Sequence, residues 1–194
     1  MECFPSCGFV VSPYMVSSSD FFHDLLPEER RVTSRADREF YGSDSCQEFR
    51  GVASHVLFPE TEEEVIAIVR RARENRIAIV PSGGRTGYSG GAAATEEEVV
   101  VSLSKMNRIL RCQDRQRTLT SQAGATTESI QRVASEHGLF YPVQFASQGS
   151  SQIGGNVATN AGGVRVLRYG STRQWVCGLR CVTGRGEVLD LQRD

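Results

Sequence analysis

Two glycine-rich stretches constrain this chain more than any other part of its sequence. Residues 81–91 read PSGGRTGYSGG, and residues 147–163 read SQGSSQIGGNVATNAGG. Glycine loses more conformational freedom on folding than any other residue, so its concentration at two places indicates that the backbone comes very close to something there. We expect an anionic ligand, because the backbone N–H groups from Gly83 to Gly90 can form a concave nest that binds phosphate without a lysine.

Neither stretch has the pattern of the two best-known nucleotide loops. The Lys-Ser or Lys-Thr ending of a P-loop is absent, and no Gly-x-Gly-x-x-Gly is followed by an acidic partner for a ribose. The first stretch follows the apolar run 77–80, and a loop that leaves a buried strand is a common ligand platform. The segment between Gly138 and Val164 contains no Asp, Glu, Lys or Arg. Such a lining suits a large and mostly neutral ligand body.

Three motifs resemble the FAD-binding domain of the vanillyl-alcohol oxidase/p-cresol methylhydroxylase flavoprotein superfamily. They are PSGGRTGYSGG at 81–91, IGGNVATNAGG at 153–163 and RYGSTR at 168–173, and the resemblance runs from about Tyr41 to the end of the chain. The closer likeness is to the branch of D-2-hydroxyacid dehydrogenases, which includes D-lactate, D-2-hydroxyglutarate and glycolate enzymes. The resemblance implies that the first loop wraps the FAD pyrophosphate and that the second segment lines the rest of the cofactor, including its flavin end. The residues that it assigns to FAD are Pro81, Gly83, Gly84, Arg85, Thr86, Gly87, Tyr88, Ser89, Pro142, Gly149, Ser150, Ser151, Ile153, Gly154, Gly155, Asn156, Thr159, Asn160, Ala161 and Gly162.

The same resemblance predicts the FAD-binding portion of an oxidoreductase that converts a D-2-hydroxy acid into the 2-oxo acid. In these dehydrogenases the substrate is held in a later cap domain, where histidines and a carboxylate hold a divalent metal. The chain ends before that domain, and before the Gly-Ser-Glu-Gly-Thr-Leu-Gly motif that closes the flavin domain. We therefore expect an inactive N-terminal fragment with no catalytic residue of its own. Two alternatives stay open: an enzyme of the ether-lipid synthase or sugar-nucleotide reductase branches, and a truncated, non-catalytic module that binds FAD or a partner.

The position after the first Gly-Gly pair predicts how FAD is held. Several relatives tether the flavin through a histidine at this position, and some add a cysteine from the second segment. This chain has Arg85 there and no cysteine between Cys112 and Cys177. A guanidinium cannot act as the nucleophile, so we expect non-covalent FAD. We also expect valine at Gly84 or Gly87 to abolish FAD binding, through a disfavoured positive φ and lost phosphate space, and Arg85→Ala to have a smaller effect.

Composition excludes several other functions. The 194 residues carry a formal net charge of −1 without a basic stripe, which argues against nucleic-acid binding. Six scattered cysteines lack Cys-x-x-Cys spacing or a histidine cluster, so the sequence predicts no metal site and reduced thiols. We expect the cytoplasm, with no leader or transmembrane segment, and leave peripheral membrane association open. His23, His55 and His137 are not placed like a substrate base, and no feature identifies the electron acceptor.

The order of the predicted elements indicates an α+β fold with two subdomains. Strand 51–59, a helix that follows a Thr61 capping box, and strand 77–80 form a small β-α-β unit with parallel strands. A larger mixed or antiparallel sheet with flanking helices follows. Its strands are expected at 98–103, 106–112, 118–123, 175–183 and 187–191, the last two forming a hairpin.

Two helices are expected between these strands. The first runs from an N-cap at Thr126 to His137 and ends at Gly138, and the second, at 153–161, directs its first N–H groups at the ligand. Residues 1–40 form a variable segment with a short helix at 20–26, and residues 41–194 form the FAD-binding domain. Tyr41–Asp44 is either the entry to that domain or a polar turn.

Overall fold

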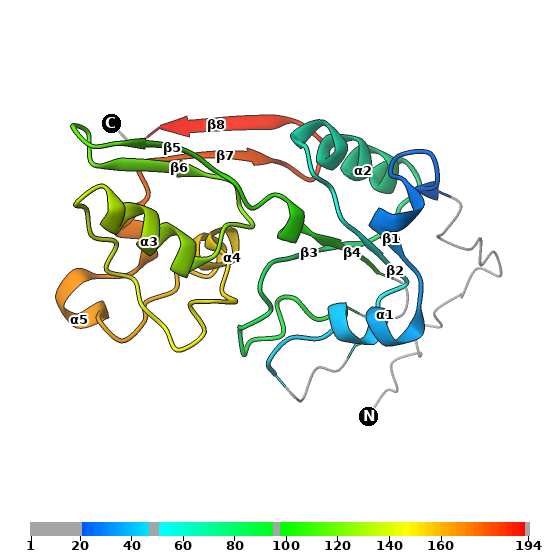
Figure 1. The fold of residues 1–194 in the computed structure, drawn as a ribbon. Coiled ribbons are helices and arrows are strands. Elements are labelled where there is room, and N and C mark those ends of the chain that lie inside the picture. The colour runs from blue at the N-terminus through cyan, green and yellow to red at the C-terminus, as the bar shows by residue number, and fades with distance from the viewer. Residues whose placement is uncertain (1–20, 47–50, 95–97, 193–194) are drawn as a thin grey trace, which may run out of the picture.

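The structure is a computed structural model that describes residues 21–46, 51–94 and 98–192, and these residues form two parts (Figure 1). The first part is a four-stranded sheet in the order β1-β2-β4-β3. Its strands are Arg31–Val32 (β1), His55–Leu57 (β2), Ile79–Ser82 (β3) and Val99–Ser102 (β4). Strands β2 and β3 both pair with β4 in parallel, whereas β1 pairs with β2 antiparallel. The predicted parallel β-α-β unit is present, with β4 between its two strands.

The central strand β4 explains why this sheet is stable. All four of its residues are buried, as expected for a parallel strand that is covered on both faces. Val99 and Val101 pack on one face with Leu57 and Ile68, and Val100 packs on the other with Val56 and Val80. The first face is covered by α2 (Glu62–Glu74), whose Ile68 and Ala72 are buried. The Thr61 hydroxyl accepts a hydrogen bond from the Glu64 N–H, so the predicted helix start is confirmed.

The second part contains two antiparallel hairpins and several short helices. The first hairpin joins Ile109–Gln113 (β5) to Thr118–Ser121 (β6), and the second joins Gly178–Val182 (β7) to Val188–Gln192 (β8). The helices are Thr127–Glu136 (α3), Ile153–Ala158 (α4) and Val166–Tyr169 (α5), with 3-10 turns at Leu103–Lys105 and Thr172–Trp175. The α+β class with two parts is confirmed, and within the described residues the antiparallel strands of the second part form two separate hairpins.

The β7–β8 hairpin connects the two parts. Its Arg180 guanidinium donates to both carboxylate oxygens of Glu62, at 2.7 and 2.8 Å, and Glu62 is the first residue of α2. Figure 1 shows the turn of this hairpin lying beside α2. This contact holds the second part against the first through residues that are 118 positions apart.

The N-terminal region differs from the sequence prediction in one respect. The predicted helix at 20–26 begins outside the described residues; residue 21 is in a 3-10 conformation, and residues 22–26 form turns and bends. Phe22 and Leu26 are 1% and 3% exposed and pack in the core beneath α2. Burial of two large side chains fixes this segment without regular helical hydrogen bonds. Helix α1 (Arg35–Tyr41) and the 3-10 turn Glu28–Arg30 follow it.

Two strands of the second part begin three residues later than predicted, for local reasons. The strand predicted from 175 begins at Gly178, because Thr172–Trp175 forms a 3-10 turn. The strand predicted from 106 begins at Ile109, because Leu103–Lys105 forms a 3-10 turn after β4. The helix predicted at 126–137 is confirmed: the Thr126 hydroxyl accepts from the Ser129 N–H, and Gly138 has a φ of 67°. In the part of the chain that the structure describes, no helix is both long and apolar enough to cross a membrane.

Candidate FAD site

The two glycine-rich stretches lie in direct contact. The first leaves the end of β3, and the second runs into α4, so the contact joins the two parts of the fold. A Cβ atom added at Gly83 would lie 3.4 Å from the Gln152 Oε1. A Cβ atom at Gly84 would overlap the carbonyl oxygen of Ser150 and lie 3.1 Å from the Ser151 Cα. The fold therefore brings together two loops that the sequence places more than sixty positions apart.

The structure changes the explanation for the glycines at positions 84 and 87, which the sequence analysis attributed to a positive φ and to space for phosphate. The backbone at Gly84 and Gly87 does not have a positive φ; in the first loop the positive values are at Arg85 (53°) and Gly90 (74°). Gly84 is required because another backbone approaches it closely. Gly87 is different, because a Cβ there meets no heavy atom within 4 Å. The space in front of Gly87 is open to a ligand, whereas the space in front of Gly84 is filled by protein.

A buried polar network holds the second loop in place. The Ser151 hydroxyl donates to the Asn156 Oδ1 at 2.6 Å, and the Asn156 Nδ2 donates to the Thr127 Oγ1 at 2.8 Å. All three side chains are at most 6% exposed. Thr127 belongs to α3 and Asn156 to α4, so the network connects the two helices beneath the loop. Because buried polar groups are costly without partners, these three residues favour a single loop conformation.

The expectation that α4 directs its first N–H groups at the ligand is wrong for its first two residues. The Ile153 N–H donates to the carbonyl of Ala125 at 2.9 Å, and the Gly154 N–H donates to that of Ala123 at 2.8 Å. Both groups are used to dock α4 against the segment that follows β6. The helix also ends at Ala158 and not at Ala161.

Four buried polar side-chain atoms of the two glycine-rich stretches have no hydrogen-bond partner among the described residues. They are the Ser82 Oγ, the Arg85 Nη1, the Gln148 Oε1 and the Gln152 Oε1. Ser82 and Gln152 lie at the loop contact, and Ser82 is 1% exposed. Gly155 is on the same side of the contact, with its N–H 3.9 Å from the Cβ position of Gly83 and open space in front of its own Cβ position. Buried polar atoms are normally hydrogen-bonded, so these atoms beside open glycines fit a polar ligand. The Ser82 hydroxyl can donate to an anionic group such as a diphosphate, whereas the Gln152 Oε1 can only accept and fits an N–H or O–H group of a ligand.

Arg85 has a different environment from the rest of the first loop. Its guanidinium lies over two rings of α1, 4.1 Å from the Phe40 centroid and 4.4 Å from the Tyr41 centroid. Burial lowers the pKa of this guanidinium from its usual value. Its carbonyl accepts a hydrogen bond from the Ser45 hydroxyl at 3.1 Å. The side chain thus anchors the loop to α1 through cation–π contacts.

The third motif, residues 168–173, supports the end of the second. The Thr172 N–H and hydroxyl donate to the carbonyl of Ala161, at 3.0 and 2.7 Å, and the Arg173 N–H donates to the Asn160 Oδ1 at 3.0 Å. Asn160 has a φ of 50°, and these bonds hold that uncommon conformation. The motif therefore positions residues of the predicted site.

The remaining predicted residues differ in exposure. Tyr88 is 79% exposed, whereas Pro142 is fully buried. Pro81 lies within β3, paired with Val101. Thr159 donates its hydroxyl to the Gly155 carbonyl at 2.9 Å.

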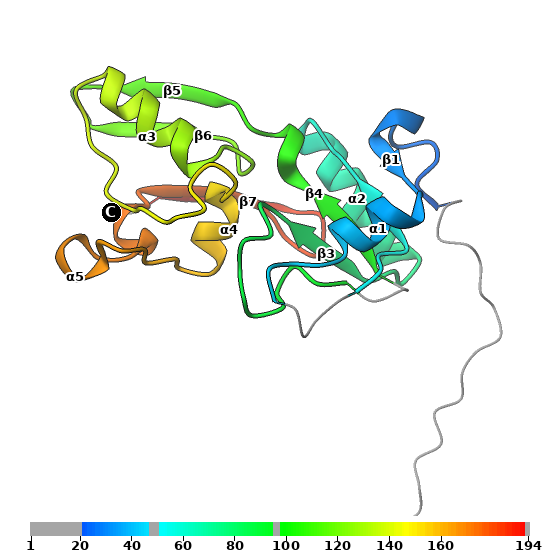
Figure 2. The ribbon, with the colours of Figure 1, turned by 60° about the horizontal axis from the view of Figure 1, so that its bottom comes forward.

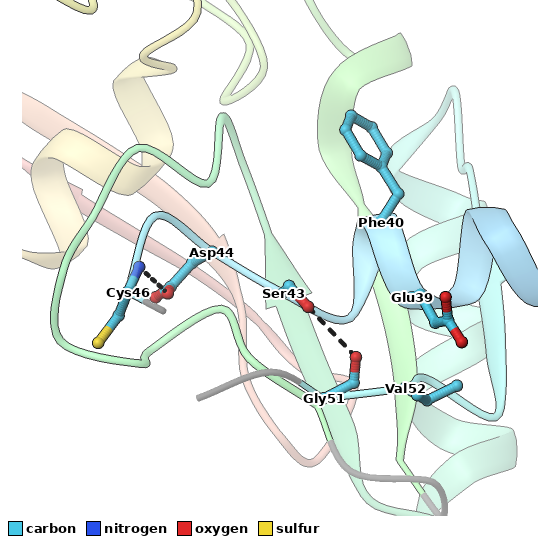
Figure 3. Close-up of a pocket in the computed structure, with 7 residues that line it drawn as sticks. All are labelled: Glu39, Phe40, Ser43, Asp44, Cys46, Gly51 and Val52. Atoms are coloured by element: carbon cyan, nitrogen blue, oxygen red, sulfur yellow. Dashed lines mark hydrogen bonds between the residues drawn. The ribbon is translucent and has the colours of Figure 1, made fainter. Parts of the chain in front are cut away.

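A surface pocket of about 500 Å³ lies next to the first loop and contains none of the predicted FAD residues (Figure 3). It is lined by Glu39, Phe40, Ser43, Asp44, Cys46, Gly51 and Val52. The segment 41–44 packs against the residues that follow the first loop, since the Ala94 N–H donates to the Gly42 carbonyl at 2.8 Å. Figure 2 shows the loop after β3 on the same side of the molecule as α1.

Comparison with known families identifies the fold. A family model described as "FAD binding domain" matches residues 53–192. The chain belongs to the FAD-binding domain family. FAD is therefore the cofactor of this domain, and the buried orphan atoms and open glycines described above fit it.

Similar proteins refine this assignment. The chain is 49% identical over 170 residues to the D-2-hydroxyglutarate dehydrogenase of Stutzerimonas stutzeri, with 87% of this chain and 37% of that protein covered. It is 51% identical over 166 residues to the D-2-hydroxyglutarate dehydrogenase of Xanthomonas citri pv. viticola, with 86% and 35% covered. The chain thus spans little more than a third of the length of these relatives. An alkyldihydroxyacetonephosphate synthase structure has the same fold, with a TM-score of 0.80 at 20% identity over 89% of this chain and 35% of that one.

Sequence reasoning missed several residues of the site. Ser82 occupies the variable position of the first motif, and Gln152 immediately precedes the second, so neither belongs to a recognisable pattern. Phe40 and Tyr41 precede the resembling region or lie at its edge. The only sequence signal for Ser82 and Gln152 was that each lies next to a glycine-rich motif.

Proposed function

We propose that this chain is the FAD-binding portion of a flavin-dependent dehydrogenase that oxidises a D-2-hydroxy acid to the 2-oxo acid. The observation that carries the proposal is the identity of about half of the aligned residues to two proteins named D-2-hydroxyglutarate dehydrogenase. D-2-hydroxyglutarate is therefore the first substrate to test. Because the chain spans little more than a third of those relatives, the activity is proposed for the whole protein.

We assign the two loops different halves of FAD. The first loop, with Gly83, Thr86 and Gly87, holds the pyrophosphate, and the buried Ser82 hydroxyl donates to it. The second segment, from Gly149 to Gly162, lines the remainder of the cofactor. Support comes from the open space at Gly87 and Gly155 and from the unpartnered Ser82 and Gln152 atoms.

The bound flavin supplies an acceptor for the hydride that leaves the alcohol carbon. The contribution of this chain is to bind and orient it. The histidines occupy other places: His55 lies in β2, and the His137 Nδ1 is 2.8 Å from the Asp114 Oδ1. His23 is in the turn before the sheet, 4.0 Å from Asp24. We therefore assign the base that takes the hydroxyl proton to a part of the protein outside these residues.

We also propose that FAD is held non-covalently. In this chain Arg85 occupies the position where several members of the superfamily have the histidine that tethers the flavin. Its guanidinium is stacked on two rings and stays protonated, so it cannot act as a nucleophile. Acid precipitation of the holoprotein is expected to leave all yellow colour in the supernatant. Flavin fluorescence in the denatured pellet would contradict this assignment, and peptide mapping would then identify the tether.

The central experiment uses the whole protein that contains this chain. Its bound flavin should bleach when D-2-hydroxyglutarate is added without oxygen, and the L enantiomer should leave the spectrum unchanged. A protein of the ether-lipid synthase type, or a non-catalytic FAD-binding module, would not be reduced by either acid. Failure to bind FAD at all would contradict the cofactor assignment, whereas binding without reduction would contradict only the substrate.

The cellular location belongs to the same proposal. Cys46, Cys112, Cys177 and Cys181 are all free thiols in the described residues. Free thiols are typical of a reducing compartment, so we propose the cytoplasm. Thiol alkylation of freshly lysed cells, with disulfide-linked peptides as the contrary outcome, tests this.

A further inference from the structure

Three potential metal ligands meet at a place that is separate from the two glycine loops. They are Cys112 in β5, Asp114 just beyond its end, and His137 at the C-cap of α3. One ligand atom from each lies within 4.8 Å of one from each of the others. The Asp114 Oδ1 is 2.8 Å from the His137 Nδ1. We propose that these three side chains form a binding site for Zn²⁺.

The local structure explains how the cluster forms. Residues two apart along a strand direct their side chains to the same face, so Cys112 and Asp114 lie on one side of the β5–β6 hairpin. Helix α3 packs against β5 and ends at Glu136, which brings His137 to that side. Gly138, with a φ of 67°, ends the helix immediately afterwards. The site is therefore carried by regular elements rather than by a loose loop.

The ligand types select the metal. A thiolate, an imidazole and a carboxylate suit zinc, whereas calcium and magnesium prefer oxygen ligands alone. Three protein ligands leave the fourth position of a tetrahedral zinc ion for water. His137 and Asp114 are 40% and 65% exposed in their side chains, so an ion has an open path to the site. On binding, the Cys112 thiol releases its proton to solvent, and the hydrogen bond between Asp114 and His137 is exchanged for two metal–ligand bonds. The ring nitrogen that binds zinc offers its lone pair, and the one ring proton of the neutral imidazole is then on the other nitrogen.

Two positive charges near the cluster lower the expected affinity for zinc, but they leave the three ligand atoms accessible. Arg115 and Arg117 are in the same turn as Asp114 and are exposed. Their positive charges oppose a divalent cation through solvent, where such interactions are weak. The sequence spacing concealed the site, because His137 follows Asp114 by 23 positions and no short motif connects them.

The test measures zinc directly and does not depend on FAD. Metal-stripped protein without an affinity tag is titrated with ZnCl₂ in competition with a chromogenic zinc indicator. The expected result is one zinc per chain. Cys112→Ser and His137→Asn should each weaken binding by at least the roughly 10–100-fold that loss of an outer-shell partner costs at known metal sites. Cys177→Ser removes an exposed thiol outside the cluster and should leave the affinity unchanged.

A second readout identifies the thiolate. Cobalt(II) in place of zinc should give a sulfur-to-cobalt charge-transfer band in the wild type and in Cys177→Ser, and no such band in Cys112→Ser. If replacement of the half-buried Cys112 unfolds the protein, Asp114→Asn provides the test, because it changes only an exposed side chain. This variant should bind zinc more weakly than the wild type. The proposal is overturned if the wild type binds no stoichiometric zinc, or if Cys112→Ser or Asp114→Asn binds it as tightly as the wild type.

Discussion

Replacement of Gly84 by alanine tests whether the contact between the two loops holds the domain together. The added Cβ would overlap the Ser150 carbonyl oxygen and lie 2.9 Å from its carbonyl carbon and 3.1 Å from the Ser151 Cα. All three atoms are backbone, so no rotamer change can relieve the overlap, and one loop must move. Overpacking of this kind costs about 1–3 kcal/mol, and a backbone obstacle places Gly84→Ala near the upper end. For a chain of this size, about 3 kcal/mol corresponds to a fall in Tm of about 6–12 °C.

Gly87→Ala is the matched control for this change. It adds the same methyl group to the same loop, where no heavy atom lies within 4 Å and φ is not positive. Without FAD, its Tm should be unchanged or slightly higher, because alanine restricts the unfolded chain by about 0.4–1 kcal/mol relative to glycine. Differential scanning calorimetry of both variants with and without FAD separates the two effects. Equal Tm values for Gly84→Ala and the wild type without FAD would refute the proposed contact. If FAD raises the Tm of Gly87→Ala as much as that of the wild type, the cofactor does not fill the space at Gly87.

Three further predictions follow from individual contacts. The Arg30 guanidinium donates to both carboxylate oxygens of Glu64 at 2.7 Å and holds the pKa of that carboxyl below its usual value. A carboxyl whose pKa is lower in the folded state stabilises the fold at a pH above its unfolded-state pKa, which is about 4.3. This stabilisation is lost as the pH falls through the folded-state pKa. Urea titrations of the wild type and Glu64→Gln measure the difference in unfolding free energy. This difference should be largest at neutral pH and should decrease below about pH 4. A difference that does not depend on pH would contradict the ion pair. Asn156→Ala should cost about 1–3 kcal/mol in urea unfolding, because it leaves the buried Ser151 and Thr127 hydroxyls without this partner, and a double-mutant cycle with Thr127→Val should show coupling. Arg85→Ala should lower stability by about 0.5–2 kcal/mol through lost cation–π contacts, and Phe40→Leu should lose part of the same energy; additive losses would show that the two side chains do not interact.

Several features of this protein were predictable from short stretches of sequence. The helix α2 was readable because Thr61 and Glu64 form its start and apolar residues recur at helical spacing. The helix α3 was readable because Thr126 caps its start and Gly138 terminates it. The FAD motifs were recognisable for a similar reason, because their glycines occupy fixed positions within a short stretch of sequence. Such signals depend on neighbours within a few residues, which the sequence displays directly.

The contacts across the site were decided by the tertiary structure alone. Gly84 approaches Ser150, and Arg85 reaches the rings of α1, because the β-α-β sheet and the α3–α4 pair place these loops against each other. Phe22 and Leu26 pack in the core although their segment does not form the predicted helix in the described residues. Cys112, Asp114 and His137 met because α3 packs on β5. Packing between distant elements follows the shape and burial of whole surfaces. The sequence therefore determined which loops could bind a cofactor, and the fold determined which side chains surround it.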